Sequence, residues 1–376
     1  MIDSQTQLTK FRRDLHRIPE LDRCLPKTVG YLTECLSALP CEIIPAGEVG
    51  FFAFFRGGRA AADAPSIAFR TDMDALPILE ENDVEYRSGH EGAMHACGHD
   101  GHMSIMLGFA SEVAAHLGEL DRNVLLVFQG AEETTGGAKE LAESGIFERC
   151  RAERIYGLHL WPGYPLGSVI CRDGDFMAST MVLYIDVHGK SSHIAQYKKG
   201  IDALETACQF IGAVYKMEKN EVSPETRRLL RFGMMNCGEA NNVVADRAHI
   251  EGTLRVYSED VRRFLRRRME EIADDICAKN GARFDFSNSD PYPAVINPHP
   301  LFADAKRILS KAGFDFIDTD EPLMPAEDFA WYQRRLPGLF FHLGTGTQAQ
   351  LHSPRYDFDE GVLPFGVRAY KSLLGI

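Results

Sequence analysis

The hydrophobic and polar positions in the first half of the chain follow two periodicities. Helical spacing covers residues 5–39, with a break around Pro19 and Pro26, and returns over residues 102–116 and 137–145. Between these segments lie nearly continuous apolar runs of strand length, at Gly50–Phe55, Ser66–Arg70, Asn123–Phe128 and Arg154–Leu158. Strands that alternate with helices predict an α/β fold with a mainly parallel, mixed sheet covered on both faces.

The pattern changes near Ala178. Strand-like segments now alternate with long amphipathic helical segments, at residues 181–187, 201–219, 249–256, 259–280 and 283–286. They form an α+β unit of about 110 residues, which is a common domain size. Because candidate site residues occur on both sides of this unit, we predict an inserted domain. The boundaries are a catalytic domain at 1–177, an inserted domain at 178–291, and the rest of the catalytic domain at 292–376.

Composition narrows the class of protein. The 376 residues exceed the size at which one hydrophobic core stops growing, which agrees with two domains. The formal net charge of −13 argues against nucleic acid or an anionic membrane as partner and is explained by solubility. The N-terminus lacks a basic region followed by an apolar core, and the nine cysteines have no framework spacing. We therefore expect a cytoplasmic protein with reduced thiols.

Polar residues gather where the predicted parallel strands end. Asp72 and Asp74 follow one strand, Glu132 and Glu133 follow a second, and His159 ends a third. In open α/β sheets ligands bind beyond the carboxyl ends of the strands, so these side chains are expected to converge.

Further candidate ligands lie in glycine-flanked loops. Cys97 and His99 are two positions apart and can face one metal, with Gly98 permitting an unusual turn between them. His352 lies in a later Leu-His-Ser-Pro segment. One thiolate, three imidazoles and one carboxylate are about what two transition-metal ions with open positions require. His95 and His102 are weaker candidates and fit packing or support of the ligands better.

The adjacent pair Glu132-Glu133 indicates a division of labour. Adjacent side chains on a loop diverge, so one carboxylate can bind metal while the other acts as a general base on water. An acidic pair near the start of a helix is the plainer alternative. We assign Asp74 to the group of carboxylates that orient ligating imidazoles.

Five segments of the chain resemble the bacterial N-acyl-amino-acid amidohydrolases, a family that includes hippurate hydrolases, N-acetyldiaminopimelate deacetylases, plant auxin-conjugate hydrolases and some carboxypeptidases. They are residues 12–20, 71–78, 94–102, 128–133 and 351–354. The resemblance implies a zinc-peptidase-like catalytic domain with an inserted lid that often dimerises, and hence a homodimer or higher homo-oligomer. It implies Glu132 as the general base. It also implies two divalent ions, zinc, manganese, cobalt or nickel, bound by Cys97, His99, Glu133, His159 and His352.

The inserted segment carries two further matches. Gly189-Lys190-Ser191-Ser192-His193 resembles the family's Gly-Lys-Gly-Gly-His turn, whose histidine helps to stabilise the oxyanion. Asn242 matches an asparagine near the substrate. Both central glycines of the turn are serine here, which bears on substrate preference. Arg255 is a candidate anchor for a substrate carboxylate, with a structural ion pair as the alternative.

The leading hypothesis is metal-dependent hydrolysis of an N-acetyl or N-aroyl amino acid, with N-acetyldiaminopimelate as one candidate substrate. Metallo-carboxypeptidase or dipeptidase activity is an alternative. Catalysis by Cys97 as a nucleophile would leave the other predicted ligands unexplained. A metal- or peptide-binding protein without turnover would have no need of Glu132.

Overall fold

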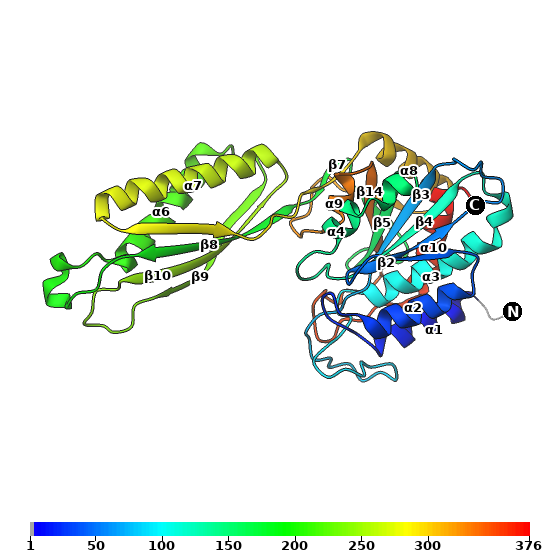
Figure 1. The fold of residues 1–376 in the computed structure, drawn as a ribbon, viewed down its shortest axis with the longest axis horizontal. Coiled ribbons are helices and arrows are strands. Elements are labelled where there is room, and N and C mark those ends of the chain that lie inside the picture. Colours follow the sequence, from blue (N-terminus) through cyan, green and yellow to red (C-terminus); the bar gives the residue numbers. More distant parts are fainter. Residues whose placement is uncertain (1–3) are drawn as a thin grey trace. The chain divides into compact units, whose positions relative to one another are not determined.

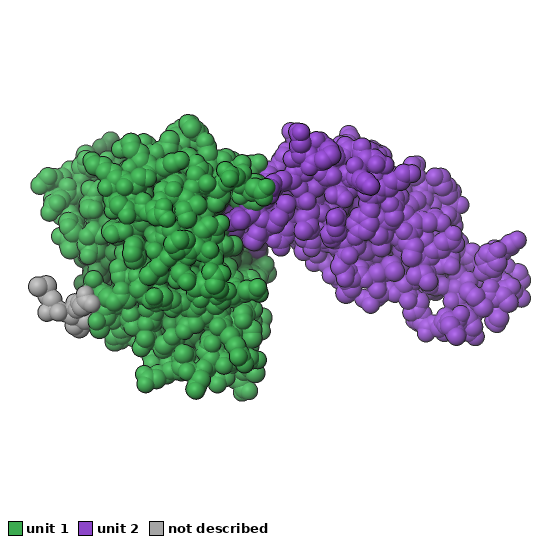
Figure 2. Space-filling view, turned by 180° about the vertical axis from the view of Figure 1, so that it is seen from behind, with its two compact units in different colours: residues 1–176, 296–322, 328–376 green, residues 177–295, 323–327 purple. Residues whose placement is uncertain are grey.

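The computed structural model describes residues 4–376, which divide into two compact units (Figure 2). Unit 1 comprises the chain up to Phe176 together with Ile296–Pro322 and Asp328–Ile376, and unit 2 comprises Met177–Val295 and Leu323–Glu327. The predicted inserted domain, 178–291, lies within the first stretch of unit 2. The short second stretch was not anticipated from the sequence.

Unit 1 is built around an eight-stranded sheet with the strand order β1-β2-β4-β3-β5-β14-β6-β13. The strands β4, β3, β5 and β14 are neighbours and run parallel, whereas β1, β2 and β6 pair antiparallel with their neighbours β2, β4 and β14. The strand bounds are β1 Glu42–Pro45, β2 Gly50–Phe55, β3 Ser66–Asp72, β4 Asn123–Gln129, β5 Ala152–Trp161, β6 Val169–Cys171, β13 Phe316–Asp318 and β14 Gly338–Gly344. The predicted mixed sheet is confirmed, and the carboxyl ends of its four central strands meet at one edge (Figure 1).

Helices cover both faces of this sheet. Every residue of β2, β3, β4 and β14 is buried, as their nearly continuous apolar runs predict. On one face the Phe69 ring centroid lies 4.6 Å from that of Phe109 in α3 and 5.0 Å from that of Tyr370 in α10. On the opposite face Phe340 packs 5.0 Å from Phe329, which directly precedes α9. The helix bounds are α1 Ser4–His16, α2 Pro26–Ser37, α3 His99–Ala115, α4 Ala138–Glu143, α5 Ile146–Arg149, α8 His299–Lys311, α9 Ala330–Gln333 and α10 Leu363–Leu374.

Unit 2 has a core of its own. Its four-stranded antiparallel sheet has the order β11-β8-β10-β9, and the helices α6 and α7 pack against it. Buried and half-buried residues alternate along β8 and most of β10, so the sheet buries one face under the helices. The bounds are β8 Ser179–His188, α6 Ala203–Glu221, β9 Arg228–Cys237, β10 Arg247–Val256, α7 Glu259–Asn280 and β11 Arg283–Asn288.

The sequence did not predict β9, because exposed and half-buried positions dominate it and no alternating apolar pattern results. Two short strands, β7 (Gly174–Met177) and β12 (Val295–Asn297), pair where the chain passes from one unit to the other. Within residues 4–376, no helix combines the length and the apolar character that crossing a membrane requires.

Candidate metal centre

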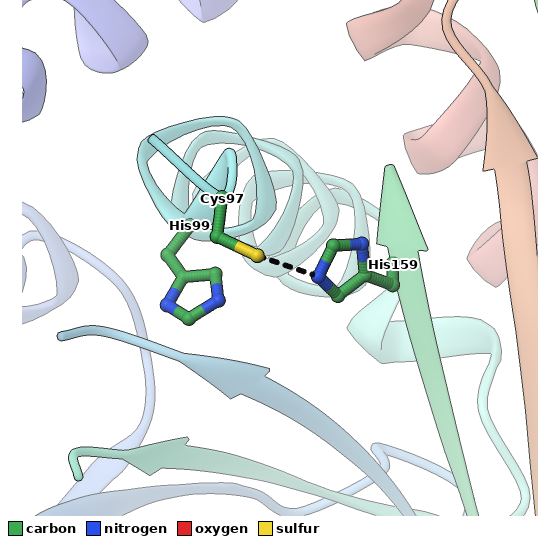
Figure 3. A group of neighbouring side chains, drawn as sticks. All are labelled: Cys97, His99 and His159. Atoms are coloured by element: carbon green, nitrogen blue, oxygen red, sulfur yellow. Dashed lines mark hydrogen bonds between the residues drawn. The ribbon is translucent and has the colours of Figure 1, made fainter. Parts of the chain in front are cut away.

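The predicted ligands of unit 1 gather at the edge where its parallel strands end. His159 lies near the end of β5, and Glu132 and Glu133 follow β4. Figure 3 shows Cys97 and His99, at the start of α3, close to His159 on β5. The Cys97 Sγ lies 3.3 Å from the His159 Nε2. The end of β5 therefore lies beside the loop that carries Cys97, at the edge of the sheet where a ligand site is expected.

Gly98 lets the chain present both candidate ligands at the start of α3. It adopts the left-handed conformation with φ of 88° and directly precedes His99, the first residue of α3. A side chain at this position would be strained, and its Cβ would lie 3.3 Å from the Tyr356 hydroxyl. Glycine therefore permits the turn that brings Cys97 and His99 to one side.

His352 and Glu133 complete the group. The His352 Nε2 lies 3.3 Å from the Cys97 Sγ and 3.3 Å from the Glu133 Oε1, and the His99 Nε2 lies 3.7 Å from that same oxygen. His352 is left-handed with φ of 61°, and its backbone N–H donates to the carbonyl of Ala96 at 2.8 Å. Backbone strain in a non-glycine residue is a frequent property of functional sites.

The donor set fits divalent metal ions. Ligands at tetrahedral angles around one zinc, at 2.0–2.3 Å from it, lie roughly 3.3–3.8 Å from each other, close to the observed spacings. Two groups of possible ligands share Cys97: one adds His99 and His159, the other adds Glu133 and His352. The buried His99 Nε2 has no hydrogen-bond partner among the described residues, and its Nδ1 donates to the carbonyl of Asp74 at 2.7 Å. This tautomer leaves the Nε2 lone pair available to a cation.

Burial favours the neutral forms of the His99 and His159 imidazoles and of the Cys97 thiol. It lowers the pKa of His99, and burial together with the nearby His102 lowers the pKa of His159 well below its usual value. Burial and the carboxylate of Glu133 raise the pKa of Cys97 well above its usual value. A nucleophilic cysteine requires the opposite shift, so these surroundings suit a metal ligand better.

Glu133 remains ionised at neutral pH despite its surroundings. Burial alone would raise its pKa, but the neighbouring imidazoles of His352 and His99 lower it below the usual value. The contact with Glu133 in turn raises the pKa of His352. The site therefore holds the carboxylate of Glu133 beside the imidazole of His352, which gains a proton readily. A divalent cation would take the place of that proton and bond to both groups.

Asp74 contacts the site through both its side chain and its main chain. Its carboxylate accepts hydrogen bonds from the backbone N–H groups of Glu132 and Glu133, each at 3.0 Å, while its backbone carbonyl orients His99. Burial raises the pKa of Asp74 well above its usual value, and the two N–H donors oppose that shift. Its side chain thus orients the paired glutamates, and its main chain orients an imidazole.

A second buried network lies behind the candidate ligands, and sequence reasoning missed two of its members, Arg70 and Asp328. Asp72 accepts from the His102 Nδ1 at 2.6 Å and from Arg70 at 2.8 Å, and Arg70 also donates to Asp328 at 3.0 Å. The His102 Nε2 accepts the N–H of Leu160, next to His159, at 2.8 Å. His102 therefore supports the strand that carries a candidate ligand. Asp328 has no local signal in the sequence, since Arg70 precedes it by 258 residues.

The remaining predicted site residues, His193, Asn242 and Arg255, lie in unit 2. His193 and Asn242 come together: His193 forms an antiparallel bridge with Val243, and the carbonyl of Asn242 accepts the N–H of Ile194 at 2.9 Å. Arg255 lies near the far end of β10 and donates to the carbonyl of Met324 at 2.7 Å. This contact supports a structural role for Arg255 and does not group it with the other two.

Comparisons with known proteins cover nearly the whole chain. The family described as peptidase family M20/M25/M40 matches residues 68–375. An uncharacterized hydrolase of Staphylococcus haemolyticus is 33% identical over 375 residues, which cover 98% of this chain and 97% of the relative. The crystal structure of the Bacillus subtilis YXEP protein, described as a dinuclear metal binding peptidase from M20 family, is 30% identical. It aligns with a TM-score of 0.86 over 99% of this chain and 97% of that one. A putative aminohydrolase from methicillin-resistant Staphylococcus aureus is 26% identical, with a TM-score of 0.92 over 99% and 97%.

Proposed function

The chain belongs to peptidase family M20/M25/M40, whose members here are hydrolases, and from this premise we propose that it hydrolyses the amide bond of N-acyl amino acids. The products are a carboxylate and a free amino acid. The observation that carries the proposal is the pair of donor groups that share Cys97, with Glu132 adjacent to one of them. The chemistry of these donors suits two divalent ions, and zinc, manganese, cobalt and nickel all accept such ligands.

We assign the ligand positions to Cys97, His99, Glu133, His159 and His352. Ions bound there would supply Lewis acidity to the amide carbonyl and to the attacking water. Glu132 takes a proton from that water and passes it to the leaving amine, which is the usual work of a positioned carboxylate base. The hydrogen bonds from its backbone and that of Glu133 to Asp74 hold it at the place where the proton moves.

We assign the residues of unit 2 to substrate binding. His193 and Asn242 are neighbours and supply a ring nitrogen and an amide, both suited to a developing oxyanion or to a substrate carboxylate. Arg255 is a weaker candidate because its guanidinium donates to a backbone carbonyl. Unit 2 would act as a lid and as the surface of a homodimer. The exposed side chains of Met234 and Met235 on β9, each 40% accessible, support the second role.

Peptide hydrolysis is the second candidate, and the description of the Bacillus subtilis relative as a peptidase favours it. Both reactions cleave an amide next to an amino-acid carboxylate and need the same base. They differ only in the group on the acyl side. N-acetyldiaminopimelate, N-aroyl amino acids and dipeptides are therefore the substrates to compare.

The deciding experiment measures free amine released from N-acetyl, N-benzoyl and dipeptide substrates, with added zinc or manganese and with a chelator. We expect metal-dependent release by the native protein and loss of about two to four orders of magnitude in Glu132→Gln, the usual contribution of a general base. The matched control is Glu143→Gln, an exposed carboxylate at the end of α4, which should leave the rate unchanged. Metal content is measured in all three proteins. Full activity in Glu132→Gln, or no release by the metal-loaded native protein, would contradict the proposal.

A further inference from the structure

The N-terminal helix α1 carries a charged cluster that the proposed reaction leaves without a role. Arg12 and His16 lie on its buried face, and the side chain of each is only 1% exposed. Both contact Asp100, which is fully buried and follows His99 in α3. Buried charges are costly unless they are paired, so an arrangement of this kind needs an explanation.

Arg12 joins two segments that lie far apart in the sequence. Its Nε donates to the Asp100 Oδ2 at 2.8 Å and one terminal nitrogen donates to the Asp357 Oδ1 at 2.7 Å. The other terminal nitrogen lies 3.3 Å from Glu360. The guanidinium also stacks 4.5 Å from the ring of Phe358. One side chain therefore ties the residue after His99 to the segment that follows His352.

His16 makes a second connection between the same segments. Its Nδ1 lies 2.7 Å from the Asp100 Oδ2, and its Nε2 lies 3.2 Å from the Glu80 Oε1. The loop that begins at Glu80 contacts the His352 segment directly. The backbone N–H of Glu81 donates to the carbonyl of Pro354 at 2.8 Å, and the side chain of Asn82 donates to the carbonyl of Tyr356 at 3.1 Å.

The His352 segment depends on such contacts. Residues 345–359 contain no helix or strand, and His352 has a strained, left-handed backbone. The hydrogen bond from its N–H to Ala96 is a direct link to the loop that carries Cys97. A single hydrogen bond contributes little net stabilisation, so additional restraints are needed to keep a strained ligand in place.

We propose that Arg12 and His16 are positioning residues that hold the Cys97–His99 loop and the His352 segment at the separation required for joint metal binding. The inference rests on the proposed function, because it assigns a role relative to the metal ligands. Neither residue needs to contact a metal ion or the substrate. The motif of residues 12–20 thus belongs to the site, through its buried face on α1.

The test is the affinity of the protein for cobalt(II), measured by competition with a chelator, in native protein and in Arg12→Lys. Lysine keeps the positive charge, but it lacks the planar guanidinium with which Arg12 contacts three carboxylates at once. We expect the affinity to fall about 10- to 100-fold, the usual effect of altering a residue that supports ligands. The thiolate-to-cobalt absorption band should weaken in parallel at subsaturating cobalt.

The matched control is Arg13→Met. Arg13 also pairs with Glu360, at 2.8 Å, and lies over the ring of Tyr86, but its side chain is 38% exposed. Its removal should leave cobalt affinity unchanged. If Arg12→Lys does not fold, Asp357→Asn takes its place in the test. The side chain of Asp357 is partly exposed, and this substitution weakens the same ion pair with Arg12, so the affinity for cobalt should also fall.

The outcomes separate the two proposals. A lower melting temperature with native cobalt affinity in Arg12→Lys, measured well below that melting temperature, would show a purely structural role and overturn the inference. Native protein that binds no cobalt would instead overturn the proposed metal centre. Reduced affinity in Arg12→Lys alongside native affinity in Arg13→Met supports the inference.

Discussion

Replacing Asp74 by asparagine tests whether this side chain positions the two glutamates. The carboxylate of Asp74 is fully buried and accepts the N–H groups of Glu132 and Glu133 with its two oxygens. Asparagine has nearly the same shape but only one acceptor oxygen, so its amide group would face one N–H donor. His99 keeps its orientation, because it donates to the backbone carbonyl of residue 74, which the substitution does not change.

The expected magnitude follows from one lost hydrogen bond. A buried N–H donor left without its acceptor costs about 1–3 kcal/mol, and each 1.36 kcal/mol changes a rate or an equilibrium tenfold. If the loss acts on the position of Glu132, kcat falls roughly 10- to 100-fold. If it also displaces Glu133, the affinity for the metal ions falls as well.

The assay measures kcat at saturating metal and metal affinity by chelator competition, with the fold checked by circular dichroism. The matched control is Asp22→Asn. The carboxylate of Asp22 accepts a hydrogen bond from the side-chain hydroxyl of Thr134 at 2.5 Å. Thr134 lies in the same loop as the two glutamates, and this hydrogen bond is exposed. Its left-handed backbone, with φ of 60°, suits asparagine. Native kcat and native affinity in a folded Asp74→Asn protein would refute the reasoning.

Two further predictions concern stability. Burial lowers the pKa of His342 to about 3, so between about pH 6.5 and pH 3 the unfolded chain binds a proton that the folded chain does not, and stability falls as the pH falls. The variant His342→Phe keeps the ring that stacks on Trp161. Its urea-unfolding free energy, measured without metal between pH 6 and 4, should lose up to about 1.4 kcal/mol less per pH unit than the native protein; equal slopes would contradict this prediction. Gly98→Ala should destabilise the protein by at least about 1 kcal/mol and weaken metal binding, because its Cβ meets the Tyr356 hydroxyl at 3.3 Å in a left-handed turn. Gly145→Ala, with φ of 79° and no atom within 4 Å of its Cβ, should show the backbone strain alone and leave metal affinity unchanged; equal metal affinity in both variants would contradict the prediction.

The local sequence pattern was sufficient to predict those features that depend on residues close together in the sequence. Strands β2, β3 and β4 are buried on both faces, so their apolar runs are nearly continuous and visible without the fold. The position of Cys97 and His99 on either side of a glycine, and of two glutamates after a strand, likewise depends on adjacent residues. The chemistry of a metal site and the α/β class could therefore be predicted.

Long-range partners could not be predicted in this way. Asp74 and Asp72 look equivalent in the sequence, yet one accepts N–H groups from the loop after β4 and the other holds His102. No neighbouring residue in the sequence distinguishes the two aspartates, because their partners depend on which loops pack beside the end of each strand. The same holds for Arg12, whose partner Asp357 is 345 residues away.

The sequence by itself determined the candidate metal ligands, which segments form the buried strands, and that a second α+β unit interrupts the first. Tertiary structure decided that Asp74 orients the glutamates, that α1 connects the two segments that carry candidate ligands, and that Leu323–Glu327 belongs to unit 2. The physical reason is that hydrogen bonds and ion pairs act over a few ångströms, whereas the residues that make them here are separated by tens to hundreds of positions. Only the packed sheet and helices bring them within that range.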